Sequence, residues 1–163
     1  RERDCECVLE DVTARFEAIY WGSDETPGLY ENETFIGDLN RLKRLCDRLP
    51  IAAVTGRPKR DAMLFLERFG ALNLFSAIIT MEDGPAKPSP MPVKTALKRL
   101  GVERAWMFGD TKDDAQAARQ AGVVPLGVIA PGAANPELTT QNLLSAGCAR
   151  VFNSWMDVED YLK

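Results

Sequence analysis

Short apolar runs alternate along this chain with longer segments whose apolar residues recur every three or four positions. Short apolar runs bounded by turn residues are typical of buried strands, and the longer pattern is typical of amphipathic helices. The predicted strands are residues 51–55, 76–80, 105–108, 124–129 and 150–152. The predicted helices are residues 35–50, 58–70, 92–101, 112–122, 136–147 and 154–162. Strands separated in this way by helices predict an α/β fold, with a Rossmann-like parallel sheet covered by helices on both faces.

Proline and glycine set the boundaries of these elements. Pro50 ends the first predicted helix, and Pro58 opens the second at a position where a helix tolerates proline. Gly70 and Gly101 follow the last apolar residues of two helices, where glycine is a common cap. In the helix that Gly101 ends, Val93 and Ala96 are predicted to face inward.

Composition limits the classes of protein that fit. With 163 residues, of which 45% are hydrophobic, the chain can bury one substantial core, and we predict a single domain over residues 1–163. The net charge of −4 argues against a nucleic-acid partner or an anionic membrane surface, and no segment approaches the length of a membrane span. Four cysteines without a zinc-site spacing indicate reduced thiols and a cytoplasmic location. The absence of histidine excludes Ser-His-Asp and Cys-His catalysis, so any chemistry must use carboxylates, lysines, hydroxyls or a metal.

Polar residues follow the predicted strands at the edge where parallel sheets bind their ligands. Thr55 and Gly56 come directly after one strand, Lys87 follows the next, and Asp110 and Asp114 follow the third. Carboxylates this close repel one another unless a cation lies among them, and hard oxygen ligands suit Mg²⁺. We therefore predict a Mg²⁺ site, with a phosphate held by Thr55, the Gly56 N–H and Lys87. A plain strand-to-helix turn and a solvated loop lysine are the structural alternatives for these residues.

The order and spacing of these residues resemble the haloacid dehalogenase-like (HAD) hydrolases, which are mostly phosphatases with a Rossmann-like core. Thr55 in "AAVTGRPKRDA" matches the second motif of the family, and Lys87 in "MEDGPAKPSPMP" matches the third. The segment "GDTKDDAQAARQAG" matches the fourth motif, with Asp110 and Asp114 as the metal-binding acids. The residues of these motifs are most similar to those of subfamily IA. The resemblance covers nearly the whole chain.

The first motif of the family corresponds to Asp4-Cys5-Glu6-Cys7-Val8-Leu9 and departs from the family pattern. The second acid is Glu6 where the family has aspartate, and Cys7 replaces a glycine. The extra methylene moves the carboxyl group by roughly 1.5 Å. The motif is therefore degenerate, with Asp4 aligned to the nucleophile and Glu6 to the general acid.

The resemblance implies a Mg²⁺-dependent phosphohydrolase that forms an aspartyl-phosphate. Asp4 would attack the phosphomonoester, and Glu6 would protonate the leaving oxygen and later activate water. The implied metal site consists of Asp4, the backbone carbonyl of Glu6, Asp110 and Asp114.

The segment between the first and second motifs is short. Members of the family usually carry a cap domain there, but residues 20–35 are too few for an independently packed unit. We therefore expect an absent or minimal cap and a site open to a small phosphorylated metabolite or a bulkier phosphorylated substrate, and the chain could form a homo-oligomer. The alternative function is a catalytically inactive HAD-like domain that serves as a binding or scaffold module.

Overall fold

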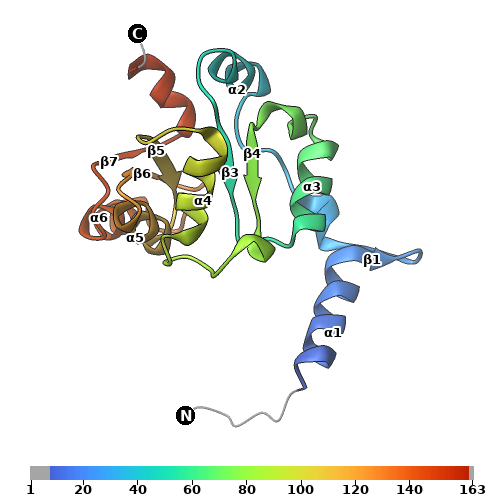
Figure 1. Cartoon of the computed structure of the whole chain (residues 1–163). Helices are drawn as coiled ribbons and strands as arrows, with labels where there is room; N and C mark the ends of the chain where they lie inside the picture. Colours follow the sequence, from blue (N-terminus) through green and yellow to red (C-terminus); the bar gives the residue numbers. More distant parts are fainter. Residues whose placement is uncertain (1–7, 162–163) are drawn as a thin grey trace, which may run out of the picture. The chain divides into compact units, whose positions relative to one another are not determined.

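The computed structural model describes residues 8–161, and the chain divides into two compact units, residues 1–35 and residues 36–163 (Figure 1). In the first unit, α1 (Leu9–Trp21) leads into a small antiparallel hairpin of β1 (Gly22–Ser23) and β2 (Thr26–Pro27), followed by the 3₁₀ helix η1 (Leu29–Asn32). None of the residues of α1 is buried. The Trp21 ring lies 5.1 Å from the Tyr30 ring, so aromatic contacts join the end of α1 to η1.

The second unit contains the parallel strands and the helices that connect them. Its strands are β3 (Ala52–Val54), β4 (Ala77–Ile79), β5 (Trp106–Gly109), β6 (Val124–Val128) and β7 (Arg150–Phe152). Its α-helices are α2 (Leu39–Cys46), α3 (Lys59–Arg68), α4 (Met91–Leu100), α5 (Lys112–Gln120) and α6 (Pro136–Ser145). Its 3₁₀ helices are η2 (Leu72–Leu74), η3 (Met81–Asp83) and η4 (Trp155–Tyr161). The predicted α/β fold with parallel strands is confirmed, although the last predicted helix is a 3₁₀ helix.

The strands of the second unit form two parallel sheets. In one sheet β3 pairs with β4, and Ala53 lies opposite Ile78. In the other sheet β6 lies between β5 and β7, and Leu126 pairs with Phe108 on one side and Arg150 on the other. The helix α4 packs against both β3 and β4 and also contacts α5 (Figure 1).

Two apolar clusters form the core around α5. Val93 of α4, predicted to face inward, is 4% exposed and packs with Ala117, Ala118 and Val123. A second cluster contains Leu143 of α6, which packs with Ala115 and Cys148. Small alanines on α5 allow close approach of its neighbours, so this helix is packed on both sides.

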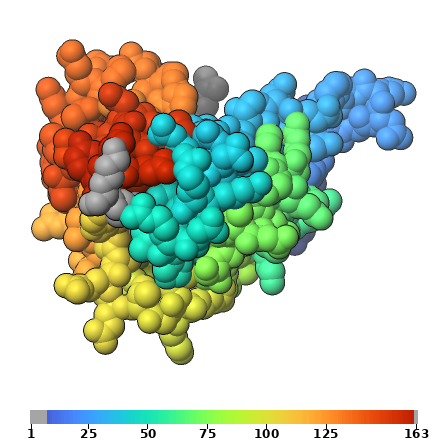
Figure 2. Space-filling model, turned by 90° about the horizontal axis from the view of Figure 1, so that it is seen from above, coloured from blue at the N-terminus to red at the C-terminus, as the bar shows by residue number. Residues whose placement is uncertain are grey.

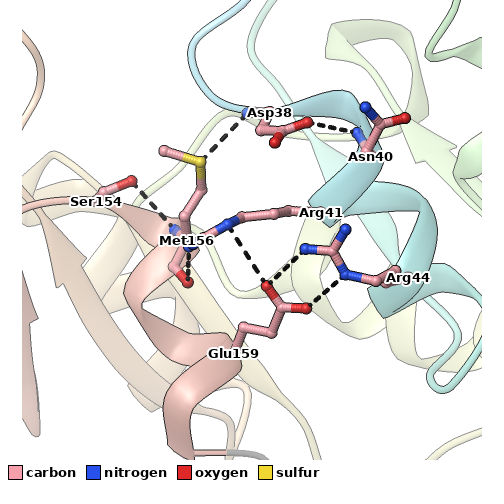
Figure 3. Close-up of polar contacts among 7 residues, drawn as sticks. All are labelled: Asp38, Asn40, Arg41, Arg44, Ser154, Met156 and Glu159. Carbon is pink, nitrogen blue, oxygen red and sulfur yellow. Dashed lines mark hydrogen bonds and ion pairs between the residues drawn. The ribbon is translucent and has the colours of Figure 1, made fainter.

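The C-terminal 3₁₀ helix η4 is held against α2 by polar contacts (Figure 3). Arg44 of α2 donates two hydrogen bonds to Glu159, from Nε to Oε1 at 2.9 Å and from Nη2 to Oε2 at 3.2 Å. Arg41 donates to the carbonyl of Met156 and lies 3.7 Å from the Glu159 carboxylate. The hydrogen bond from Arg44 holds the pKa of Glu159 below its ordinary value. In the view from above, the surfaces of α2 and of η4 lie side by side (Figure 2).

The core of α6 offers a test with a matched control, because Leu143 is 2% exposed and Leu144 next to it is 48% exposed. We expect Leu143→Ala to lower the free energy of unfolding by about 2–4 kcal/mol, since it removes buried methyl groups and leaves a cavity. Leu144→Ala should change it by less than about 0.5 kcal/mol. Chemical denaturation of both variants measures the difference, and equal effects would show that α6 is not packed as described.

Candidate functional site

The predicted site residues that the structure describes follow the carboxyl ends of β3 and β5 or lie in the loop after β4. Thr55 follows β3 directly, and its N–H donates to the Ile79 carbonyl of β4 at 2.9 Å. The Thr55 Oγ1 accepts a hydrogen bond from the backbone N–H of Arg57 at 3.1 Å. This bond bends the chain into the turn that contains the exposed Gly56.

Lys87 links the two sheets at this edge. Its Nζ donates to the carbonyl oxygen of Val54, the last residue of β3, at 3.3 Å. The same Nζ lies 2.5 Å from Oδ1 of Asp114 in the first turn of α5. The side chains of Lys87 and Asp114 are 21% and 8% exposed, so the ion pair is largely shielded from water. The structure therefore brings Lys87 and Asp114 together, next to Thr55.

Asp114 is fixed by the start of α5. Its Oδ2 accepts hydrogen bonds from the hydroxyl and the N–H of Thr111, at 2.7 and 3.2 Å, and the Thr111 hydroxyl accepts one from the Asp114 N–H. This reciprocal arrangement is a capping box, and its Thr-x-x-Asp spacing is visible in the sequence although the site prediction did not use it. The buried Oδ1 accepts no hydrogen bond from the described residues and faces Lys87. Asp114 thus positions Lys87, while Asp110, the residue after β5, is exposed.

Gly109 allows this arrangement because it has no side chain. A Cβ atom on Gly109 would lie 2.3 Å from the Cβ of Asp114 and 2.7 Å from its Cγ. The carboxylate of Asp114 therefore lies directly against the backbone at the end of β5, a contact that the sequence motifs do not indicate.

Of the four predicted metal ligands, the structure describes two, Asp110 and Asp114. Between residues 8 and 161, no three carboxylate, cysteine or histidine side chains lie close enough to hold a metal ion. Mg²⁺ is commonly held through one or two carboxylates plus waters and substrate phosphates, so Asp110 and Asp114 have suitable chemistry. The other predicted ligands and catalytic residues, Asp4 and Glu6, lie outside the described residues.

Glu82 joins the loop after β4 to the start of α3. Its two carboxylate oxygens accept the backbone N–H of Lys59 at 2.9 and 3.0 Å, and the N–H of Met81 donates to the carbonyl of Arg57. The Lys59 N–H, followed by the Thr80 hydroxyl, holds the pKa of Glu82 below its ordinary value. These contacts fix the turn that follows Thr55.

The lowered pKa of Glu82 predicts a dependence of stability on pH. A carboxylate whose pKa is lower in the folded state stabilises the fold above its unfolded pKa, and this contribution is lost as the pH falls through the folded pKa. We expect Glu82→Gln to weaken the loss of stability below about pH 4. Urea unfolding across this range measures the effect, with Glu103→Gln at an exposed loop position as the control. Identical pH profiles for Glu82→Gln and the unaltered chain would contradict the assignment.

None of the helices between residues 8 and 161 combines the length and apolar character that crossing a membrane would require.

The family profile of the haloacid dehalogenase-like hydrolases matches residues 29–128, and the chain belongs to this family. The chain is 50% identical over 128 residues to an imidazoleglycerol-phosphate dehydratase from Phytophthora nicotianae, covering 76% of this chain and 28% of that protein. It is 35% identical over 83 residues to a phosphoglycolate phosphatase from Neisseria meningitidis, covering 49% and 35% of the two chains. It is 36% identical over 101 residues to the pyrophosphatase PpaX from Bacillus velezensis, covering 60% and 46%. The chain thus spans less than half the length of each of these relatives.

Solved structures share the fold. A haloacid dehalogenase-like hydrolase from Streptococcus pneumoniae superimposes with a TM-score of 0.65 at 20% identity, over 79% of this chain and 60% of that chain. A HAD-superfamily hydrolase from Ehrlichia chaffeensis superimposes with a TM-score of 0.61 at 19% identity, over 99% and 80% of the two chains. At these identities the likeness establishes the fold alone.

Proposed function

We propose that this chain forms the phosphate-binding part of a Mg²⁺-dependent phosphohydrolase that acts on a phosphomonoester. The observation that carries the proposal is the position of Lys87, whose ammonium is fixed between the end of β3 and Asp114. A lysine held at the carboxyl edge of a parallel sheet, beside a threonine hydroxyl, suits the oxygens of a phosphoryl group. Phosphatases among the relatives support the same reaction class.

The residues have separate roles in this proposal. Thr55 and Lys87 bind phosphoryl oxygens and orient the phosphorus for attack. Asp114 holds the Lys87 ammonium in place, and Asp110 with Asp114 would hold Mg²⁺, which offsets negative charge on the phosphate when bound. A carboxylate nucleophile that forms an aspartyl-phosphate completes the reaction, and Asp4 with Glu6 remains the prediction from the sequence for that step.

The alternative function is a phosphate-binding module without turnover. Its support is the departure of the first motif from the family pattern at Glu6 and Cys7. Binding and turnover therefore have to be measured separately.

The first measurement is hydrolysis of an aryl phosphate by the protein, with millimolar Mg²⁺ or with a chelator. The second measurement is the binding of vanadate. We expect metal-dependent turnover that falls at least about 100-fold in Asp110→Asn, because an electrostatic contribution of this kind is worth that much. Asp113→Asn, at an exposed position in the same helical turn, is the matched control. Vanadate binding without turnover would support the binding module, and the absence of both would overturn the proposal.

A further inference from the structure

A cavity of about 320 Å³ lies beside β4. Its lining comes from β4 itself, from the turns at both ends of this strand, and from α3 and α4. Thr55, Lys87 and Asp114 do not line it, so the cavity is separate from the proposed phosphate site. A volume of this size is within the range of sites that bind small molecules.

The backbone of β4 provides one hydrogen-bond donor to this cavity. Within residues 8–161, β4 pairs with β3 on one side only (Figure 1). The carbonyl of Ile79 accepts the Thr55 N–H, so the backbone groups of Ile79 face β3. Since the groups of successive strand residues point to opposite sides, those of Ile78 point to the unpaired side. Ile78 lines the cavity, and its N–H is therefore available there.

Arg99 of α4 closes this side of β4 against another strand. Its Nη1 donates to the carbonyl of Ile78 at 3.0 Å, and its Nη2 pairs with the Asp83 carboxylate. Asp83 also accepts the N–H and the hydroxyl of the buried Thr80, at 2.8 and 3.1 Å. An added strand would need both backbone groups of Ile78, and one of them is already bonded. The cavity therefore suits a small molecule rather than an extended peptide.

The charges that line the cavity favour an anion. Lys59 and Arg99 are the cationic residues of the lining, and Asp83 is its one carboxylate. The charge of Asp83 is offset by Arg99, whereas the Lys59 ammonium forms no ion pair with any residue that the structure describes. The lining thus has an excess of one positive charge, and Lys59 carries it.

The rest of the lining is largely apolar. Met63 of α3 and Phe75, which precedes β4, are both half-buried and both line the cavity. Apolar side chains together with a few polar groups are the usual lining of a site for an organic ligand. A simple inorganic anion would leave this apolar surface uncovered.

We propose that the cavity beside β4 binds a small organic carboxylate that carries an aromatic or branched apolar group. The carboxylate would accept hydrogen bonds from the Lys59 ammonium and the Ile78 N–H, and a charged donor strengthens such a bond. The apolar group would lie against Met63 and Phe75 and remove their exposed surface from water.

Calorimetric titration with benzoate tests the site, and it requires neither phosphate nor metal, so its outcome is independent of the proposed function. We expect a dissociation constant on the order of 1 mM, which is reasonable for so small a ligand. Benzamide lacks the charge and acetate lacks the ring, so each should bind at least about 10-fold more weakly. Equal affinity for benzamide or for acetate would overturn the proposal, as would no binding of benzoate at ~20 mM.

Lys59→Gln is the decisive variant, because it removes the unpaired charge from an exposed position. Benzoate should bind at least about 10-fold more weakly to it, while the unfolding midpoint stays nearly unchanged. Lys98→Gln is the matched control, since Lys98 is also exposed and lies next to Arg99 but does not line the cavity. Equal affinities of the two variants would contradict the role of Lys59.

NMR chemical shifts locate the bound ligand. Benzoate should shift the amide signal of Ile78 and leave that of Gly56, beside the proposed phosphate site, unchanged. Shifts at Gly56 without a shift at Ile78 would place benzoate in the phosphate site and overturn the proposal.

Discussion

Lys87→Ala should reduce the affinity for vanadate at least about 100-fold, a loss typical of removing one preorganised charged donor. The same change should lower the free energy of unfolding by about 2–4 kcal/mol, because it leaves the carboxylate of Asp114 buried without its cation. Calorimetric titration and urea unfolding measure the two effects on one sample. Unchanged affinity would remove Lys87 from the proposed site.

A double variant separates the two consequences of losing Lys87. Lys87→Ala combined with Asp114→Asn removes both charges, so much of the stability should return while vanadate binding stays lost. An unimproved double variant would show that the ion pair does not account for the destabilisation. Recovery of binding together with stability would show that Lys87 acts only through the fold.

Gly109→Ala is expected to displace Asp114. It should therefore disrupt the ion pair through its carboxylate, whereas Lys87→Ala removes the ammonium. The added Cβ would lie 2.3 Å from the Asp114 Cβ, closer than atoms can approach, so the first turn of α5 must move. We expect a loss of about 1–3 kcal/mol in the free energy of unfolding, as is usual for overpacked sites. Binding of vanadate should also weaken, because the displaced carboxylate no longer holds Lys87.

Gly56→Ala is the control for stability in this comparison. No atom lies within 4 Å of a Cβ placed on Gly56, so its substitution should leave the unfolding midpoint nearly unchanged. Thermal unfolding of both variants measures the difference. A Gly109→Ala protein as stable as Gly56→Ala would show that Asp114 does not rest on the end of β5.

The pattern of apolar positions predicted every strand of the second unit, because each strand is a short apolar run that turn residues bound on both sides. Helix boundaries followed from local chemistry, as Gly101 at the end of α4 illustrates. The helix predicted over residues 35–50 was too long, because α2 spans only Leu39–Cys46. Leu42 and Leu45 within α2 are buried, whereas Leu49 lies beyond its last residue and is 44% exposed.

The division into two sheets could not be predicted from local pattern. Pairing between strands depends on contacts between residues far apart in the sequence, and no periodicity within β3 or β5 states which neighbour each has. For the same reason the sequence indicated that Lys87 and Asp114 share a site, but not that the two side chains form an ion pair or that Thr111 holds Asp114. These details depend on the geometry with which α5 begins at the end of β5.

The contact between Arg44 and Glu159 joins residues 115 positions apart. At ordinary rates of synthesis, α2 emerges from the ribosome roughly 6–23 s before the residue that binds it. During that interval its two arginines remain in solvent, and the chain has to hold α2 near its place without η4. A nascent chain halted before Glu159 would leave Arg41 and Arg44 without this carboxylate, so α2 would depend on its apolar contacts alone.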